Sequence, residues 1–225
     1  MIRIKQSLKQ TWEDARRNPV YTAIYVTGVA LAVTFTMIFA MVYYVKIAPV
    51  YPEYNRLSTS YITYAEGYCE SQHMTCGSGL GYRAYKEYLS RLKNVKYMTA
   101  TLEDRFSESA TILPDDGRPE IKTVSKGVDA DFFKVYEFEF LKGKPFTAID
   151  VDDARLVAVI SDRLADRLFG SPEAAMGREV NLENTYYRVA GVVREGSNLT
   201  DKSFAQIYVP LTTRPDYDRT SCDYE

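Results

Sequence analysis

Two of the three cysteines and the only histidine lie within eight residues of one another, so this segment holds the side chains best suited to metal or redox chemistry. Cys69, His73 and Cys76 offer thiolate and imidazole ligands of the kind that bind zinc. A structural zinc site needs four ligands, and no fourth is evident in the sequence. In an oxidising compartment, two cysteines at this spacing can instead form a disulfide. We therefore favour a Cys69–Cys76 disulfide or free thiols over a metal, with Cys222 left unpaired.

Catalytic patterns are weak in this sequence. A Ser–His–Asp or Cys–His site would have to use His73, because the chain has one histidine. A Gly-x-Ser-x-Gly turn is missing, and Ser78 stands in a short glycine-containing stretch that is typical of a loop. We expect no catalytic residue, and an anchored outer hydrolase is the weakest of the functional hypotheses.

The carboxylates and the glycine-lysine pair do not indicate a cofactor site. Acidic clusters fall in predicted turns, where solvation is the simplest interpretation: Asp115, Asp116, Asp150, Asp152 and Asp153. A calcium site at the second cluster lacks the longer loop pattern of a calcium-binding hand. Gly143-Lys144 is followed by Pro145 rather than by Ser or Thr, so it is not a phosphate-binding loop. We expect no metal and no cofactor in this chain.

The element that must position everything else is an apolar run near the start. Asn18 to Val45 carries no charged residue. Residues 20–45 would form a helix about 39 Å long, enough to cross a hydrocarbon core of about 30 Å with some tilt. A cleavable signal peptide has a shorter apolar region that ends at small residues. The run therefore predicts one transmembrane helix over residues 20–45.

The charges beside this run predict its orientation. Residues 1–19 carry an excess of Lys and Arg over acidic residues, whereas residues 46–65 carry few basic residues. Because basic loops stay in the cytoplasm, we expect residues 1–19 inside and residues 46–225 outside. The net charge of the whole chain is −2, which does not favour nucleic-acid binding.

Two helical faces are candidate interaction sites. In residues 1–19, Leu8 and Trp12 lie at helical spacing on an apolar face, which predicts an amphipathic helix at the inner membrane surface. Within the span, small residues recur every fourth position and would let another helix approach closely. This predicted packing face consists of Gly28, Ala32, Thr36 and Ala40.

The outer region mixes strands with short helices, which predicts an α+β domain with mainly antiparallel pairing. Residues 46–80 contain several Pro and Gly and are predicted to be irregular. We expect helices near 82–93, 129–136 and 162–169, and strands near 95–102, 108–113, 119–126, 156–160, 178–183, 186–194 and 204–209. The first helix should bury an apolar face made of Tyr85, Tyr88, Leu89 and Leu92.

From Gly127 onward the sequence carries an ordered set of short motifs. The set consists of Phe140-Leu-Lys-Gly-Lys-Pro-Phe146, Val157-Ala-Val-Ile-Ser-Asp-Arg-Leu164, Met176-Gly-Arg-Glu-Val180, Tyr187-Arg-Val-Ala-Gly-Val-Val193 and Ile207-Tyr-Val-Pro210. With the basic start, the first span and the outer domain after it, this set resembles the MacB-like ABC transporter permeases, also called the MacB/FtsX permease family. The motifs are scaffold signals: strands, a capped helix, and turns at glycine.

The resemblance implies a permease subunit that couples ATP hydrolysis to movement of the outer domain. It implies a separate cytoplasmic ABC ATPase that holds the ATP, and a second permease copy, identical or not. It also implies a periplasmic adaptor and a bacterial inner membrane as the location. The stub, the span and the periplasmic domain would be residues 1–19, 20–45 and 46–225.

The sequence departs from the family in one respect. Such permeases continue after the outer domain with three further membrane helices, whereas residues 46–225 hold no second long apolar run. We therefore expect an N-terminal fragment or a truncated permease. A single-span sensor or ligand-binding module is the alternative.

Overall fold

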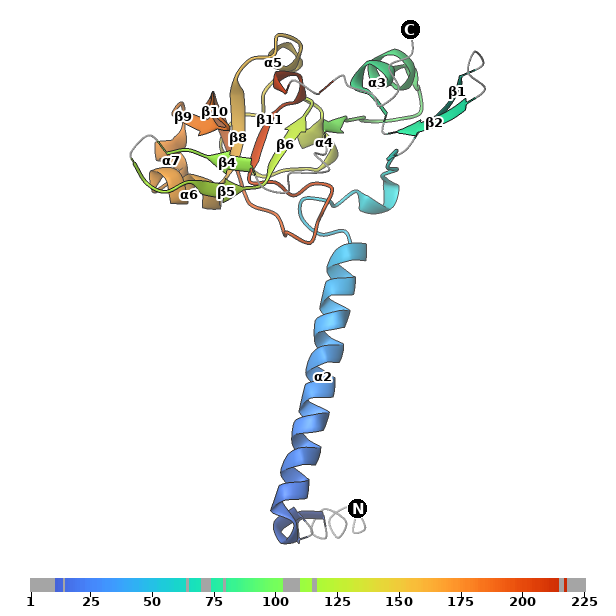
Figure 1. Ribbon diagram of the computed structural model, residues 1–225, viewed down its shortest axis with the longest axis vertical. Coiled ribbons are helices and arrows are strands. Elements are labelled where there is room, and N and C mark those ends of the chain that lie inside the picture. Colours follow the sequence, from blue (N-terminus) through green and yellow to red (C-terminus); the bar gives the residue numbers. More distant parts are fainter. Residues whose placement is uncertain are drawn as a thin grey trace. The chain divides into compact units, whose positions relative to one another are not determined.

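A computed structural model describes residues 11–13, 15–63, 65–69, 74–78, 80–102, 110–114, 117–214 and 217, with the backbone alone for 65–69 and 74–78. The chain divides into two compact units, Met1–Ala48 and Pro49–Glu225 (Figure 1).

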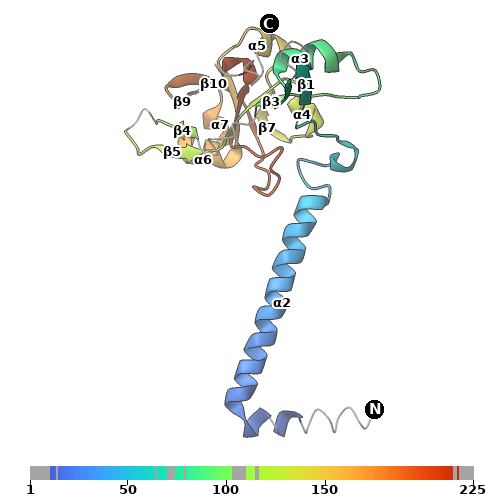
Figure 2. The same cartoon turned by 45° about the vertical axis from the view of Figure 1, so that its right-hand side comes forward.

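The first unit is helical. Residues 11–13 and 15–17 are helical, Asn18 leaves the helical conformation, and helix α2 spans Pro19–Ile47 (Figure 2). Proline is suited to the first helical position, since it lacks the N–H group that would have no partner there. The C-cap residue Ala48 stops the helix after Ile47: it is extended and donates its N–H to the Tyr44 carbonyl at 2.7 Å. The apolar helix expected over residues 20–45 is confirmed.

The described residues of the second unit form a nine-stranded mixed sheet and a separate two-stranded hairpin. The sheet order is β3-β6-β11-β8-β10-β9-β4-β5, and β7 pairs with β10. The strands are β3 (Thr101–Leu102), β4 (Ala110–Ile112), β5 (Ile121–Thr123), β6 (Ser125–Val128), β7 (Phe140–Gly143), β8 (Val157–Ser161), β9 (Glu179–Leu182), β10 (Thr185–Val193) and β11 (Ile207–Pro210). Two pairs are parallel, β10 with β8 and β11 with β6, and the others are antiparallel. The expected α+β fold with mainly antiparallel pairing is confirmed.

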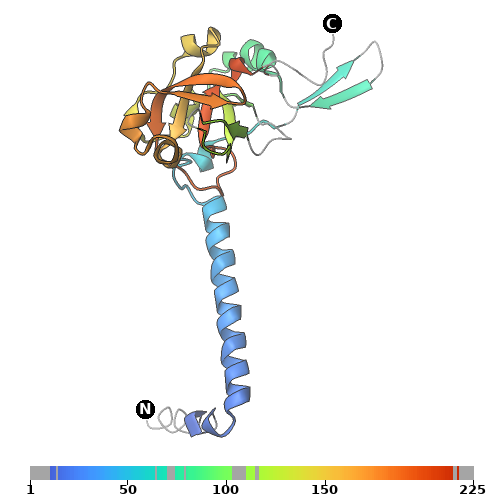
Figure 3. The same cartoon turned by 60° about the vertical axis from the view of Figure 1, so that its left-hand side comes forward.

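Both faces of the sheet are covered by a cluster of buried side chains. Successive residues of a strand point to opposite faces, so they belong to different clusters. In β8, Ala158 and Ile160 join one cluster, whereas Val159 joins the other. Helices α6 (Asp162–Phe169) and α7 (Pro172–Ala175) pack on the first cluster, and they lie together in Figure 1 and Figure 3. Helix α4 (Phe132–Val135) supplies Phe132 and Phe133 to the second cluster, which is rich in aromatic rings.

Local signals account for several elements. Ser161 caps α6 by accepting a hydrogen bond from the Leu164 N–H at 3.2 Å, and Gly170 ends the helix with φ +83°. Helix α5 (Ala148–Asp152) begins with a capping box between Thr147 and Asp150. Strands β9 and β10 are joined by two residues with positive φ, Glu183 and Asn184, as in the turn that suits a twisted hairpin.

The region from residue 46 to residue 102 differs from the prediction. It contains the antiparallel hairpin β1 (Ala65–Cys69) and β2 (Met74–Ser78), and a 3-10 turn η1 (Arg56–Ser58). Glycines within the strands concealed this hairpin, since Gly in a strand normally indicates a break.

Two predicted strands also differ from the structure. The strand expected at 95–102 is confined to β3, and the strand expected at 119–126 divides into β5 and β6. The chain changes partner at Val124, whose carbonyl accepts from the N–H groups of Gln206 and Ile207.

The first outer helix is shorter than predicted, and its expected apolar face is only half-buried, through Tyr85 and Leu89. Helix α3 spans Tyr82–Tyr88, and a 3-10 turn η2 (Leu89–Arg91) follows. Tyr88 and Leu92 are 68% and 53% exposed. Tyr85, which belongs to the expected face, also holds the helix through its hydroxyl, which donates to the Met98 carbonyl at 3.1 Å and lies 3.2 Å from Asp129 Oδ2. The last 3-10 turn, η3, spans Leu211–Thr213.

Candidate functional site

Helix α2 is apolar on all sides and has no buried residue. Val42 and Val45 are half-exposed, and the other large side chains around its circumference are each at least 46% exposed: Val20, Tyr21, Ile24, Tyr25, Val26, Val29, Leu31, Val33, Phe35, Met37, Ile38, Phe39, Met41, Tyr43, Tyr44 and Ile47. A helix of this kind is stable only where lipid or other helices cover it. It is the one described helix that is long and apolar enough to cross a membrane.

The predicted packing face lies along this helix. An added Cβ at Gly28 would meet no atom within 4 Å, so this position is open. The hydroxyl of Thr36 donates to the Ala32 carbonyl at 2.8 Å, and Thr34 donates to Ala30 in the same way. These threonines therefore need no outside partner, and the face offers close contact rather than hydrogen bonds. Whether another helix covers it stays a prediction.

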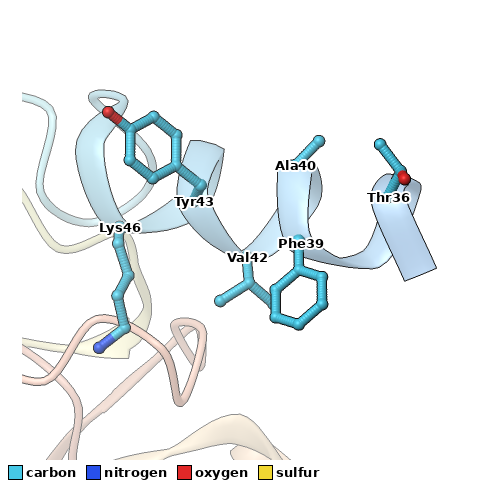
Figure 4. Close-up of a pocket in the computed structure, with 6 residues that line it drawn as sticks. All are labelled: Thr36, Phe39, Ala40, Val42, Tyr43 and Lys46. Carbon is cyan, nitrogen blue, oxygen red and sulfur yellow. The ribbon is translucent and has the colours of Figure 1, made fainter.

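A shallow hollow lies at the C-terminal half of α2. It is lined by Thr36, Phe39, Ala40, Val42, Tyr43 and Lys46. Figure 4 shows Thr36, Ala40 and Tyr43 along one line of the helix, with Phe39, Val42 and Lys46 beside them. The short side chains of Thr36 and Ala40 beside aromatic rings produce the hollow. Its lining is almost entirely apolar, which suits an acyl chain or a neighbouring helix.

In the segment before α2, Trp12 is 64% exposed. The Arg16 guanidinium lies over its ring, 5.8 Å from the centroid, which is a cation–π contact between residues one helical turn apart. An indole and a guanidinium on one side of a helix suit the boundary between lipid and water. Leu8, the other residue of the predicted interfacial face, lies outside the described residues.

The two cysteines of the predicted pair are on adjacent strands. Cys69 is opposite Met74, and Cys76 is opposite Gly67, so the cysteines are diagonal neighbours offset by two residues. Diagonal Cα atoms in such a pair are about 7–8 Å apart, whereas disulfides usually join Cα atoms about 4.4–6.8 Å apart. The Cys69–Cys76 disulfide stays a prediction, and its formation would require an adjustment of this register. His73 and Cys222 lie outside the described residues.

The acidic residues near α5 are engaged in helix capping and ion pairs. Asp150 accepts from the Thr147 N–H at 2.7 Å and pairs with Arg155 at 3.1 Å, and Asp153 pairs with the same arginine at 3.0 Å. Asp152 pairs with Lys86 at 2.6 Å. In the part of the chain that the structure describes, no group of three His, Cys, Asp or Glu side chains could hold a metal ion. Asp115 and Asp116 lie outside that part.

The structure also contains buried polar residues that the sequence analysis did not predict. Glu53 is 3% exposed and Lys126 is 6% exposed. Both bind the loop between β10 and β11. Their partners in this loop are 75 or more residues away in the sequence, so no local pattern could have identified these contacts.

The sequence matches the model of the MacB-like periplasmic core domain over residues 22–221, and the chain belongs to this family. The motifs from Gly127 onward and the apolar helix before the sheet domain are therefore parts of one family pattern. Together, the family and α2 indicate a membrane-anchored protein with an extracellular domain, of the kind found in MacB-like ABC transporter permeases.

The chain is similar to parts of two kinds of curated exporter. It is 30% identical over 128 residues to the macrolide export ATP-binding/permease protein MacB of Bartonella henselae, covering 56% of this chain and 18% of that protein. It is 38% identical over 77 residues to the pyoverdine export ATP-binding/permease protein PvdT of Pseudomonas aeruginosa, covering 34% and 12%. The matches thus span less than a fifth of these relatives.

Among solved structures, the periplasmic region of MacB from Actinobacillus actinomycetemcomitans aligns with a TM-score of 0.46 at 21% identity, covering 56% of this chain and 52% of that chain. The extracellular domain of the transporter YknZ, from Gram-positive bacteria, aligns with a TM-score of 0.43 at 24% identity, covering 54% and 58%.

Proposed function

We propose that this chain is a permease subunit, or the N-terminal part of one, of a MacB-like ABC transporter. The observation that carries the proposal is the family match over residues 22–221, which extends from the apolar helix through the sheet domain. Residues 1–19 would lie in the cytoplasm, residues 20–45 would cross the inner membrane, and residues 46–225 would form the periplasmic domain.

In this proposal the chain transmits movement and catalyses no reaction. A partner ABC ATPase in the cytoplasm would bind and hydrolyse ATP, and its closure would shift the membrane helices. The face made of Gly28, Ala32, Thr36 and Ala40 would pack against a helix of the assembly, formed with a second permease copy. The outer domain would then move, alone or with a periplasmic adaptor.

The proposal is tested with the intact gene product, expressed with the ABC ATPase that we expect to be encoded beside its gene. A spin label at Lys93→Cys, in a background without the native cysteines, reports the distance between two outer domains in nanodiscs. We expect this distance to change when ATP replaces ADP. An unchanged distance, in a complex that hydrolyses ATP, would contradict the proposal.

The packing face is tested in the same assay. Gly28→Leu adds a large side chain to this face, whereas Val29→Leu changes a neighbouring position on another side of α2. We expect Gly28→Leu to weaken the association of the spans and the Val29→Leu control to leave it intact. Equal effects of the two substitutions would contradict the packing face.

A further inference from the structure

We propose that the buried carboxylate of Glu53 anchors the chain that leaves α2 to the sheet of the outer domain, so that movement of the helix is passed to the sheet through this side chain. The proposal rests on the transport function proposed above and identifies a positioning residue within it. Glu53 lies six residues after the end of α2 at Ile47.

Both oxygens of the Glu53 carboxylate have partners. Oε1 accepts from the N–H and the hydroxyl of Ser203, at 3.1 and 2.6 Å. Oε2 accepts from the Nε and a terminal nitrogen of Arg56, at 2.8 and 2.6 Å. Hydrogen bonds to a charged group are stronger than neutral ones, and a buried charge that loses its partners is strongly destabilising. The segment that carries Glu53 therefore cannot move relative to the loop between β10 and β11 without breaking these hydrogen bonds, and their loss would cost free energy.

The loop that Glu53 contacts is itself joined to the middle of the sheet. The Ser203 carbonyl accepts from the Tyr208 hydroxyl at 3.0 Å, and that hydroxyl accepts from the Ala205 N–H at 3.1 Å. Tyr208 lies on β11, between β6 and β8, and is 1% exposed. Burial raises the pKa of Tyr208, so its hydroxyl stays protonated and remains a donor. Two hydrogen-bonded steps thus connect Glu53 to a central strand.

A lysine holds the same loop from another strand. The ammonium group of Lys126, on β6, donates to the carbonyls of Asp201 and Lys202 at 3.0 and 2.8 Å. The loop is therefore fixed from two adjacent strands, β6 and β11, immediately beside the residue that receives Glu53.

Tyr51 provides a second attachment, two residues before Glu53. Its hydroxyl donates to the Arg194 carbonyl at 2.8 Å and accepts from the Glu139 N–H at 3.2 Å. Its ring meets Phe138 edge to face, with centroids 6.2 Å apart. Burial raises the pKa of Tyr51 to about 12, so this hydroxyl also stays protonated at neutral pH.

The attachments converge on one end of the sheet. Arg194 follows the last residue of β10, Glu139 precedes β7, and the loop that carries Ser203 leads into β11. Strand β10 pairs with β7, β8 and β9, so a displacement at this end acts on a hydrogen-bonded unit. In Figure 1, the cyan segment after α2 runs beside the orange-red loop between β10 and β11.

The anchor is tested by hydrogen exchange on the full chain in nanodiscs, with Glu53→Gln and Tyr208→Phe as variants. Glu53→Gln removes the charge of the anchor. Tyr208→Phe removes only the hydroxyl that donates to the Ser203 carbonyl, so it still tests the connection if the Glu53 variant does not fold. We expect the Ser203 and Arg56 amides to exchange at least tenfold faster in both variants, with unchanged exchange in β8 and β9. Glu173→Gln, which alters an exposed ion pair with Lys142 at 3.0 Å, is the control and should have no effect.

Transmission is tested in the complex with the ATPase, using the spin label described above. We expect Glu53→Gln to reduce the ATP-dependent distance change at least twofold while ATP hydrolysis continues. A full distance change in this variant, or exchange that rises equally in β8 and in the anchored segment, would overturn the proposal. If the wild-type complex shows no distance change, the transport function fails, whereas the exchange data still decide whether Glu53 is the anchor.

Discussion

Gly143 shows how closely two segments of the sheet approach each other. Its φ is +69°, and an added Cβ would lie 2.8 Å from the Gly191 Cα and closer still to the Ala190 carbonyl oxygen. Gly191 lies at an irregularity in the pairing of β10 with β8. A side chain at Gly143 would therefore face both backbone strain and a collision with main-chain atoms, which cannot move as the end of a flexible side chain can.

We expect Gly143→Ala to lower the free energy of unfolding by about 3 kcal/mol, the sum of the left-handed penalty and of overpacking. Gly170→Ala is the matched control, because Gly170 has φ +83° but open space around its Cβ position. It should cost only about 1 kcal/mol. Urea unfolding of the detergent-solubilised protein, followed by near-ultraviolet circular dichroism, measures both. If both variants lost the same free energy of unfolding, the lack of space around Gly143 would contribute nothing.

Asp150 gives a pH-dependent prediction. The Thr147 N–H, the Thr147 hydroxyl and Arg155 lower the pKa of Asp150 below its ordinary value of 3.8. Folding therefore favours the carboxylate, and this stability is present above pH 3.8 and is lost as the pH falls through the lowered pKa. We expect Asp150→Asn to cost about 1 kcal/mol at pH 7, with a smaller difference from wild type below pH 3.8.

Unfolding at pH 7 and at pH 3 measures this change. Asp152→Asn is the control, since the pair of Asp152 with Lys86 is exposed and such pairs contribute little. A cost of Asp150→Asn that is the same at both pH values would contradict the capping role.

At the scale of elements, α6 is fastened to the sheet by its N-cap. Besides capping the helix, the Ser161 hydroxyl donates to Glu195 Oε2 at 2.9 Å, and the Glu195 side chain is 9% exposed. Ser171 caps α7 through the Ala174 N–H at 3.1 Å, and its side chain also hydrogen-bonds to the carboxylate of Glu173, which is exposed. The two serines thus compare capping beside an exposed carboxylate with capping beside a buried one.

We expect Ser161→Ala to lower the free energy of unfolding by about 2–3 kcal/mol, and Ser171→Ala by about 1 kcal/mol. The larger loss at Ser161 reflects a partly buried carboxylate that loses a donor. Thermal unfolding of the two variants under identical conditions measures the difference. Equal losses would mean that the contact with Glu195 contributes nothing.

Elements with local signals could be predicted from the sequence, and elements held by distant partners could not. Ser161 and Gly170 mark the ends of α6 within ten residues, and the apolar run marks α2. The hairpin β1–β2 was missed because its glycines indicate breaks. The apolar periodicity of residues 82–93 located a helix but not its environment, since burial depends on what packs against it. The contact of Glu53 with Ser203 joins residues 150 positions apart, and no short pattern encodes it.

At the scale of the whole molecule, the two units require different surroundings. The second unit covers its sheet with two clusters of buried side chains, whereas α2 buries none of its residues. A membrane would supply the missing cover for α2. The basic residues of the stub then predict which side the sheet unit occupies.

We expect cysteines introduced at Lys93 to react with a membrane-impermeant maleimide in spheroplasts, in a background without the native cysteines. Cysteines introduced at Thr11 should react only after the membrane is permeabilised. Labelling of the purified, solubilised protein at both positions is the control for reactivity. If the cysteine at position 11 reacted in intact spheroplasts and the cysteine at position 93 did not, the orientation would be the opposite of the predicted one.

Within the residues that the structure describes, the two strands at the ends of the sheet order are short: β3 comprises two residues, and β5 comprises three. Strands of this length present few free main-chain groups to a neighbouring polypeptide, so they are poor templates for the addition of a foreign strand. Proteins crowded side by side in a lipid bilayer meet one another often, and an open border would make each encounter a risk of aggregation. At these two short edge strands, a neighbouring protein would meet mainly side chains rather than a row of free main-chain groups.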